Sequence, residues 1–140
     1  MIRFVTGIFL LMAMLMPIAA QSTLYHSNND AIFREALDQY EKEKYATAQK
    51  LFEQAYELYS LNTELKSLSQ FYIAQCAMRL FNADAELLTM QFIRENPKSV
   101  KVNDAWFSLG GYFYTLKKWN SCIEVYSHVE LPLLCWPCES

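Results

Sequence analysis

Glycine and proline are scarce in this chain of 140 residues, which contains three glycines and four prolines. After residue 20 the glycines are the pair Gly110–Gly111, and the prolines are Pro97, Pro132 and Pro137. Sheets joined by tight turns need more of these residues, because glycine and proline supply the backbone angles that turns require. We therefore expect an all-α fold after the N-terminal segment.

An excess of positive charge is also lacking. The chain carries 12 basic and 15 acidic residues, a net charge of −3. The densest basic clusters are Lys42 with Lys44 and the pair Lys117–Lys118, and both fall where we expect turns between helices. A nucleic-acid-binding protein needs a basic face that neutralises phosphates. We therefore expect no nucleic acid among the partners.

Motifs for catalysis and for metal binding are missing as well. The two histidines, His26 and His128, have no cysteine or carboxylate at a metal-ligand or catalytic spacing. The sequence has no phosphate-binding loop, nucleophile elbow or helical zinc motif. We expect a protein that is not an enzyme and that has no cofactor and no metal.

The N-terminus reads as an export signal over residues 1–20. Arg3 precedes an apolar run over residues 4–16, and the small pair Ala19–Ala20 marks a cleavage point. The run is shorter than the roughly 17–25 residues that span a bilayer. Its extension to residue 20 leaves an uncleaved anchor, the only expected membrane contact, as the alternative. No cysteine lies at the end of the apolar stretch, so we expect no lipid anchor. Residues 21–29 form a linker.

The clearest structural unit covers residues 103–130. Its two helices each carry a stripe of apolar and small residues, separated by a turn at Lys117–Lys118. The inward positions are Trp106, Leu109, Gly110 and Phe113 in the first helix, and Trp119, Cys122, Tyr126 and Val129 in the second. The small residues Gly110 and Cys122 let the two helices approach closely, and the aromatic side chains fill the space beside them.

Two earlier units complete the pattern, over residues 30–63 and 64–98. In the first, the inward faces consist of Phe33, Ala36, Leu37 and Tyr40, then of Tyr45, Ala48, Phe52 and Ala55. In the second, a first helix that is apolar all round is expected to be buried on both sides, and Pro97 ends the second helix. The small residues Ala48, Ala85 and Cys122 recur at equal intervals, which predicts three units.

The pattern W-x2-L-G-x2-F from Trp106 to Phe113, followed by an aromatic, a small and an aromatic residue, is similar to the tetratricopeptide repeat (TPR). The stretch N-P-K-S-V-K-V-N-D-A-W-F-S-L-G resembles the linker of envelope repeat proteins of Gram-negative bacteria, including outer-membrane assembly and cell-division coordinators. The resemblance covers residues 30–130 and is strongest in the last third. This chain departs from the assembly lipoproteins because it lacks their lipidated cysteine.

The resemblance implies a right-handed stack of antiparallel helical hairpins, an α-solenoid of about three units. It also implies a scaffold or adaptor of the periplasm or cell envelope that binds a partner polypeptide in a concave groove. In the last unit, the residues beside the inward stripe would face this groove, namely Asp104, Phe107, Gly111 and Tyr114. The alternative for Phe107 and Tyr114 is packing against a following unit.

The tail over residues 131–140 is irregular and contains a Cys135-Trp-Pro-Cys138 motif. A thiol-redox role for this pair is an alternative function, although no strand precedes the motif. A zinc site would lack a second pair of ligands. We therefore favour a disulfide formed after export. Cys76 and Cys122 are expected to be buried and inert. The break in composition suggests a truncated or frame-shifted form of a longer repeat protein.

The three predicted units are not followed by a polar capping helix. Stacked repeats generally require one, because the last apolar face is otherwise exposed to water. Self-association into a homodimer through Tyr126, Val129 and Leu131 is therefore a third possible role.

Overall fold

The computed structural model describes residues 31–130. This part of the chain contains six helices and no strand, which confirms the all-α expectation for it. Residues 31–41 are helical, and the elements that follow are α3 (Tyr45–Leu58), α4 (Thr63–Arg79), α5 (Ala85–Glu95), α6 (Val102–Thr115) and α7 (Trp119–Tyr126). The expected signal, linker and tail, with the Cys135–Cys138 pair, lie outside the described residues.

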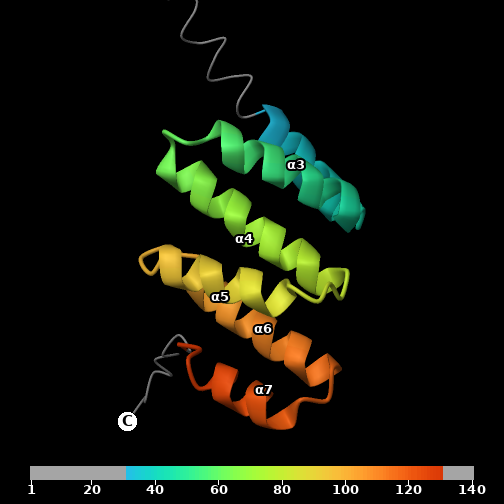
Figure 1. Cartoon of the computed structure of the whole chain (residues 1–140), viewed down its shortest axis with the longest axis vertical. Coiled ribbons are helices and arrows are strands. Elements are labelled where there is room, and N and C mark those ends of the chain that lie inside the picture. The colour runs from blue at the N-terminus through green and yellow to red at the C-terminus, as the bar shows by residue number, and fades with distance from the viewer. Residues whose placement is uncertain (1–30, 131–140) are drawn as a thin grey trace, which may run out of the picture.

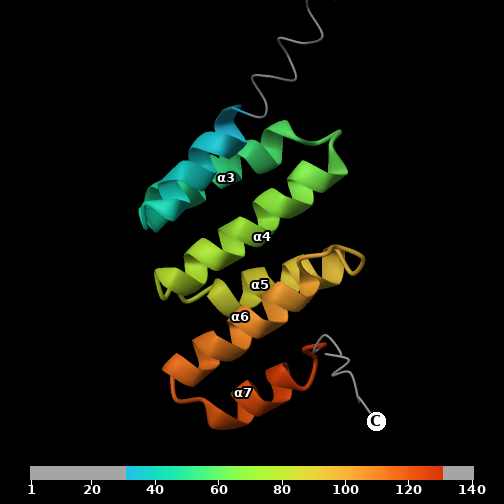
Figure 2. The ribbon, with the colours of Figure 1, turned by 180° about the vertical axis from the view of Figure 1, so that it is seen from behind.

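The helices contact one another in chain order along one long axis (Figure 1). α3 packs against α4, α4 against α5, α5 against α6, and α6 against α7, while α4 also reaches α6. The view from behind shows the same succession (Figure 2). Within the described residues, none of the helices has the length and hydropathy needed to cross a membrane. The helices form three successive pairs: residues 31–41 with α3, α4 with α5, and α6 with α7.

Each pair is joined by a turn with the same backbone geometry. Glu43, Phe81 and Lys117 have positive φ angles of 59°, 56° and 59°. At each turn, the amide of the following residue donates to a carbonyl in the last turn of the first helix; these bonds are Lys44 N to Gln39 O at 2.9 Å, Asn82 N to Ala77 O at 3.0 Å and Lys118 N to Phe113 O at 2.9 Å. This is the Schellman cap, in which a left-handed residue lets the chain reverse. The recurrence of one cap supports three equivalent hairpins.

Polar side chains mark two ends of the middle hairpin. Asn62 caps α4, because its side-chain oxygen accepts a hydrogen bond from the amide of Leu65 at 3.2 Å. α5 ends at Glu95, immediately before Asn96 and Pro97, as the sequence predicts. The carbonyl of Phe92 accepts two hydrogen bonds from Asn96, one from its backbone amide at 2.9 Å and one from its side chain at 3.1 Å.

The core runs along the stack, and α4 contributes to every part of it. One side of α4 supplies Ile73 and Cys76 to the cluster shared with α3, and another side supplies Ala77 and Met78 to the cluster shared with α6 and α7. Phe71 of α4 packs with Phe92 of α5. α4 is therefore buried between neighbours on both sides, as its apolar sequence predicts.

Candidate functional site

Two adjoining hollows lie along the first helices of the three pairs. One encloses about 530 Å³ between the start of α3, the C-terminal half of α4 and the middle of α6. The other encloses about 580 Å³ between residue 40, α4, the start of α6 and residues 129–130. Both are lined by Gln75, Arg79, Phe107 and Ser108, so they adjoin at these side chains. We refer to the two hollows together as the groove.

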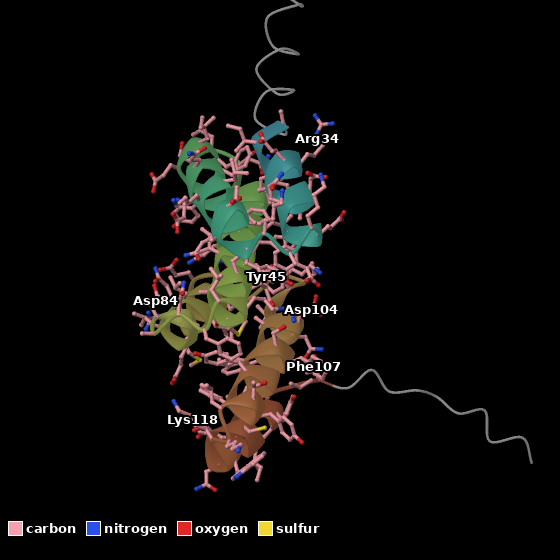
Figure 3. The ribbon with its side chains drawn as sticks, turned by 90° about the vertical axis from the view of Figure 1, so that its right-hand side faces the viewer. Arg34, Tyr45, Asp84, Asp104, Phe107 and Lys118 are labelled. Carbon is pink, nitrogen blue, oxygen red and sulfur yellow. The ribbon has the colours of Figure 1, made fainter. Side chains whose placement is uncertain are left out.

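α6 places three of the four residues predicted to face a groove along this surface. Phe107 lines both hollows and is 61% exposed, Gly111 lines the first hollow, and Asp104 lines the second. Offsets of three and four residues put these positions on one side of a helix. Figure 3 shows Asp104 and Phe107 on one side of the molecule, and Asp84 and Lys118 on the opposite side.

Tyr114, the fourth predicted residue, lines neither hollow. It is as exposed as Phe107, at 61%, but its ring packs edge-on against Trp119 of α7, with the ring centroids 5.3 Å apart. Seven residues separate Phe107 from Tyr114, so they lie on similar sides of an ideal helix, two turns apart. Near the end of α6, Thr115 still lines the first hollow, whereas the side chain of Tyr114 lies beside the start of α7.

The residues predicted to pack within the repeats are mostly buried. The side chains of Ala48, Phe52, Ala55 and Leu109 are fully buried. Those of Phe113 and Cys122 are 3% and 6% exposed. Gly110 is buried under the ring of Tyr126, which is 36% exposed. Trp106 is half-buried and stacks on His128, with the ring centroids 4.5 Å apart. Trp119, at 52% exposure, is the least buried member of this predicted set.

Arg79 is the cation at the centre of the groove. It is the last residue of α4, and its guanidinium carbon lies 5.8 Å from the centroid of the Tyr45 ring. Burial raises the pKa of Tyr40, and the positive charge of Arg79 and a hydrogen bond from it oppose this rise. Two aromatic side chains from residues 31–45 therefore hold the guanidinium over the hollows.

The acidic residues of the groove surround this cation at a distance. Glu43 lines the first hollow, and Asp104 and Glu130 line the second. Asp104 forms an ion pair with Lys101 at 2.8 Å, and the hydrogen bond of this pair raises the pKa of Lys101. Among residues 31–130, Arg79 has no carboxylate within ion-pair distance.

Sequence reasoning did not single out Arg79, Gln75 or Tyr45 as groove residues. The signal that identifies them is the equivalence of the three first helices, because α4 must present a side to the same surface as α6. This side of α4 could not be recognised from the sequence, because the helix is apolar nearly all round and Gln75 and Arg79 are its only polar residues in the last two turns. Their spacing of four residues places them together on that side.

The cysteines and histidines of the described residues form no site together. No group of three or more histidine, cysteine, aspartate or glutamate side chains within residues 31–130 is arranged to hold a metal ion. Cys76 and Cys122 are buried free thiols, as expected. Burial, with a smaller effect of the charge on Glu53, raises the pKa of Cys76 to about 12. The Cys76 side chain is therefore a protonated packing group at neutral pH.

Comparison of the chain with models of protein families, with curated protein sequences and with solved structures finds no match.

Proposed function

We propose that this protein is an exported TPR-type scaffold of the bacterial cell envelope, and that its groove binds a segment of a partner polypeptide. In this proposal the hairpins form a right-handed α-solenoid, residues 1–20 direct export, and the protein acts by binding and not by catalysis. The observation that carries the proposal is that Phe107, a large apolar side chain, is 61% exposed in a groove lined by all three first helices.

Two features of the hairpins support the comparison with TPR proteins. The small residues Ala48, Ala85 and Cys122, which recur at equal intervals, all lie in buried positions of second helices. The positive-φ residues of the three caps recur at nearly the same interval. Repeats of this kind present their first helices on one surface, where extended segments or helices of other proteins bind.

The groove also has the chemistry of a polypeptide-binding surface. Aromatic rings from four helices line it: Tyr40, Tyr45, Phe71, Tyr72, Phe107 and Tyr112. Aromatic side chains supply large contact areas and dominate the energetics of many protein interfaces. Polar groups such as Gln75 and Ser108 lie between the rings and can bond to the backbone of a bound segment.

Phe107 and Tyr114 provide a matched pair for the test. Both are aromatic residues of α6 and both are 61% exposed, but only Phe107 lines the groove. A photo-crosslinking residue at position 107 is expected to trap a partner in intact cells, and Phe107→Ala should abolish recovery of that partner with the tagged full-length chain. Tyr114→Ala should retain the partner, and both variants should keep the far-UV spectrum of a helical protein. Equal recovery with Phe107→Ala and wild type would reject the groove as the binding surface.

Self-association is the second candidate function, and the outer side of α7 favours it. Trp119 and Ile123 are 52% and 71% exposed and lie one helical turn apart. Tyr126 is 36% exposed, although its ring also covers Gly110 of α6. Tyr126 follows the small residue Cys122 at the same offset at which Phe52 follows Ala48. Phe52 is fully buried and stacks on Tyr72 of α4, with the centroids 4.9 Å apart.

This side of α7 would then pair with α7 of a second copy of the chain. Sedimentation velocity should show a dimer that becomes more populated with concentration, and Ile123→Glu should make the protein monomeric. Leu87→Glu, at a site on α5 that is 65% exposed, is the matched control and should leave the dimer intact. A wild-type protein that stays monomeric at all concentrations would exclude this role.

A further inference from the structure

Among the described residues that line the groove, Arg79 is the one cation, and no carboxylate of residues 31–130 forms an ion pair with it. Arg79 lines both hollows and lies where they adjoin. Two other cations of the described residues, Lys42 and Lys101, form ion pairs with Asp38 and Asp104 at 2.7 and 2.8 Å. Arg79 instead lies over the ring of Tyr45 and donates a hydrogen bond to Tyr40, and no carboxylate of residues 31–130 lies within ion-pair distance of it.

A guanidinium placed in this way is suited to a carboxylate from outside the chain. Its N–H donors have a planar fork geometry that matches the two oxygens of a carboxylate, and such charge-assisted bonds are stronger than neutral hydrogen bonds. A phosphate group would fit the same fork. However, Glu43, Asp104 and Glu130 line the same hollows, and their negative charge disfavours a dianion more than a single carboxylate.

Apolar side chains form part of the lining of each hollow. Met78 and Phe107 line the first hollow, and Phe71, Tyr72 and Val129 line the second. In an extended polypeptide, alternate side chains point to the same side and lie about 7 Å apart. A residue over Arg79 would therefore have its neighbours two positions before and after it over the two hollows.

We propose that Arg79 binds an aspartate or glutamate of an extended partner segment, and that apolar side chains two residues before and after this acidic residue occupy the two hollows. The inference rests on the proposed function, because it specifies what the groove binds. It defines a ligand class: a segment in which an acidic residue is flanked at alternate positions by apolar residues.

The test begins with a phage-displayed library of random nonapeptides, selected on the immobilised full-length chain. Selection on wild type and on Phe107→Ala identifies the peptides that depend on the groove. The proposal expects these peptides to be enriched in an acidic residue with apolar residues at both alternate positions. Selection on Arg79→Gln should keep the apolar preference and lose the acidic one.

The best peptide is then synthesised with a fluorophore, together with a copy in which glutamine replaces the acidic residue. Binding is measured by fluorescence anisotropy. On wild type, the replacement should weaken binding roughly tenfold, as expected for the loss of one charge-assisted contact. On Arg79→Gln, the two peptides should differ less than twofold, and Arg79→Glu should instead prefer a peptide with lysine at this position.

Arg94→Gln is the matched control, because Arg94 is an exposed arginine in the last turn of α5 that lines neither hollow. It should leave the tenfold difference between the peptides unchanged. Peptides that depend on Phe107 but show no acidic preference, or whose acidic preference survives Arg79→Gln, would overturn the role of Arg79 and leave the groove function standing. A library that yields no peptide dependent on Phe107 would reject both.

Discussion

The ring of Tyr126 lies directly over the backbone of Gly110 and leaves no room for a β-carbon there. A β-carbon at residue 110 would lie 2.6 Å from Cε1 and 2.7 Å from Cζ of this ring. Contacts this short do not occur in folded proteins, so the ring would have to move. The ring of Tyr126 also contacts Phe107, with the centroids 5.8 Å apart, and therefore links α7 to the groove side of α6.

The first prediction is that Gly110→Ala destabilises the protein. Alanine in a helix interior is normally more favourable than glycine by roughly 0.5–1 kcal/mol. Here the new methyl group displaces Tyr126 and loosens the packing of α7, and overpacking of this kind usually costs about 1–3 kcal/mol. We expect a net loss of about 1 kcal/mol in the free energy of unfolding, measured by urea denaturation.

The neighbouring glycine gives the control. A β-carbon at Gly111 would lie 3.8 Å from the hydroxyl oxygen of Tyr126, which is ordinary contact, so Gly111→Ala should stabilise the protein by about 0.5–1 kcal/mol. In a Tyr126→Ala background, Gly110→Ala should also become stabilising. A Gly110→Ala variant that is more stable than wild type would contradict the close-packing role of Gly110.

The sequence predicted a close approach of the two helices at Gly110 and Cys122, because size and periodicity together specify it, but it placed Tyr126 beside these small residues and not over Gly110. A small residue at the inward position of one helix and an aromatic residue at the inward position of the next are the pattern of two helices in close approach. Gly110, Cys122 and Tyr126 carried that pattern. The end of α5 was predictable for a different reason, since Pro97 restricts the backbone of the residue before it.

The sequence did not predict which exposed aromatic residues share a surface. Phe107 and Tyr114 lie on the same side of α6. Helical periodicity predicts the side of the helix on which a residue lies, but it does not predict which neighbouring helix faces each turn. Trp119 belongs to an inward stripe by spacing, yet no described helix covers its outer side. Arg79 was missed because its role depends on tertiary contacts with Tyr40 and Tyr45, which come from a different hairpin.

The second prediction concerns Lys117, which has a φ of 59° in the turn between α6 and α7. The left-handed conformation is unfavourable by roughly 1 kcal/mol for a residue with a β-carbon and is not for glycine. The Lys117 side chain is exposed, so its removal loses little packing. Lys117→Gly should therefore raise the free energy of unfolding by about 0.5–1 kcal/mol, measured as a shift in the midpoint of denaturation.

Lys118→Gly is the control for this effect, because Lys118 has a φ of −86° and a glycine relieves no left-handed strain there. It should leave the stability unchanged or lower it, since glycine increases the conformational entropy of the unfolded chain. If both variants had the same effect, the strain at Lys117 would not be its cause.

The third prediction follows from the pKa of Cys76, which burial raises to about 12. The thiol of the unfolded chain titrates near its ordinary value of about 8.5. Above that pH the unfolded state loses the proton and the folded state keeps it, so stability is full below pH 8.5 and falls as the pH rises. The slope approaches about 1.4 kcal/mol per pH unit.

Cys76→Ala should be less stable than wild type at pH 7, because it leaves a cavity beside α3, and should show a flatter pH dependence. Chemical denaturation between pH 8 and 10, with a reductant present, measures both slopes. This range avoids most of the titration of Tyr40, whose pKa is also raised. The other cysteines are present in both proteins, so their contributions cancel. Parallel slopes would show that Cys76 is not protonated more strongly in the folded state.

The last prediction concerns Asn103, whose side chain holds the chain after α7 against the start of α6. Its amide nitrogen donates to the carbonyl of Glu130 at 3.0 Å, and its oxygen accepts from the amide of Glu130 at 2.8 Å. Asn103→Ala removes both bonds and should lower the free energy of unfolding by about 1 kcal/mol, since each exposed bond contributes modestly.

Asn103→Asp separates the two bonds, because a carboxylate still accepts from the Glu130 amide and cannot donate to its carbonyl. Amide exchange measured by NMR should show that the Glu130 amide stays protected in Asn103→Asp and becomes rapidly exchanging in Asn103→Ala. The amide of Cys122, which donates within the first turn of α7 to the carbonyl of Lys118 at 3.0 Å, should stay protected in both variants and serves as the internal control. If the Glu130 amide exchanged equally in wild type and Asn103→Ala, this attachment would not restrain the chain in solution, and the second hollow would lose the side that residues 129–130 supply.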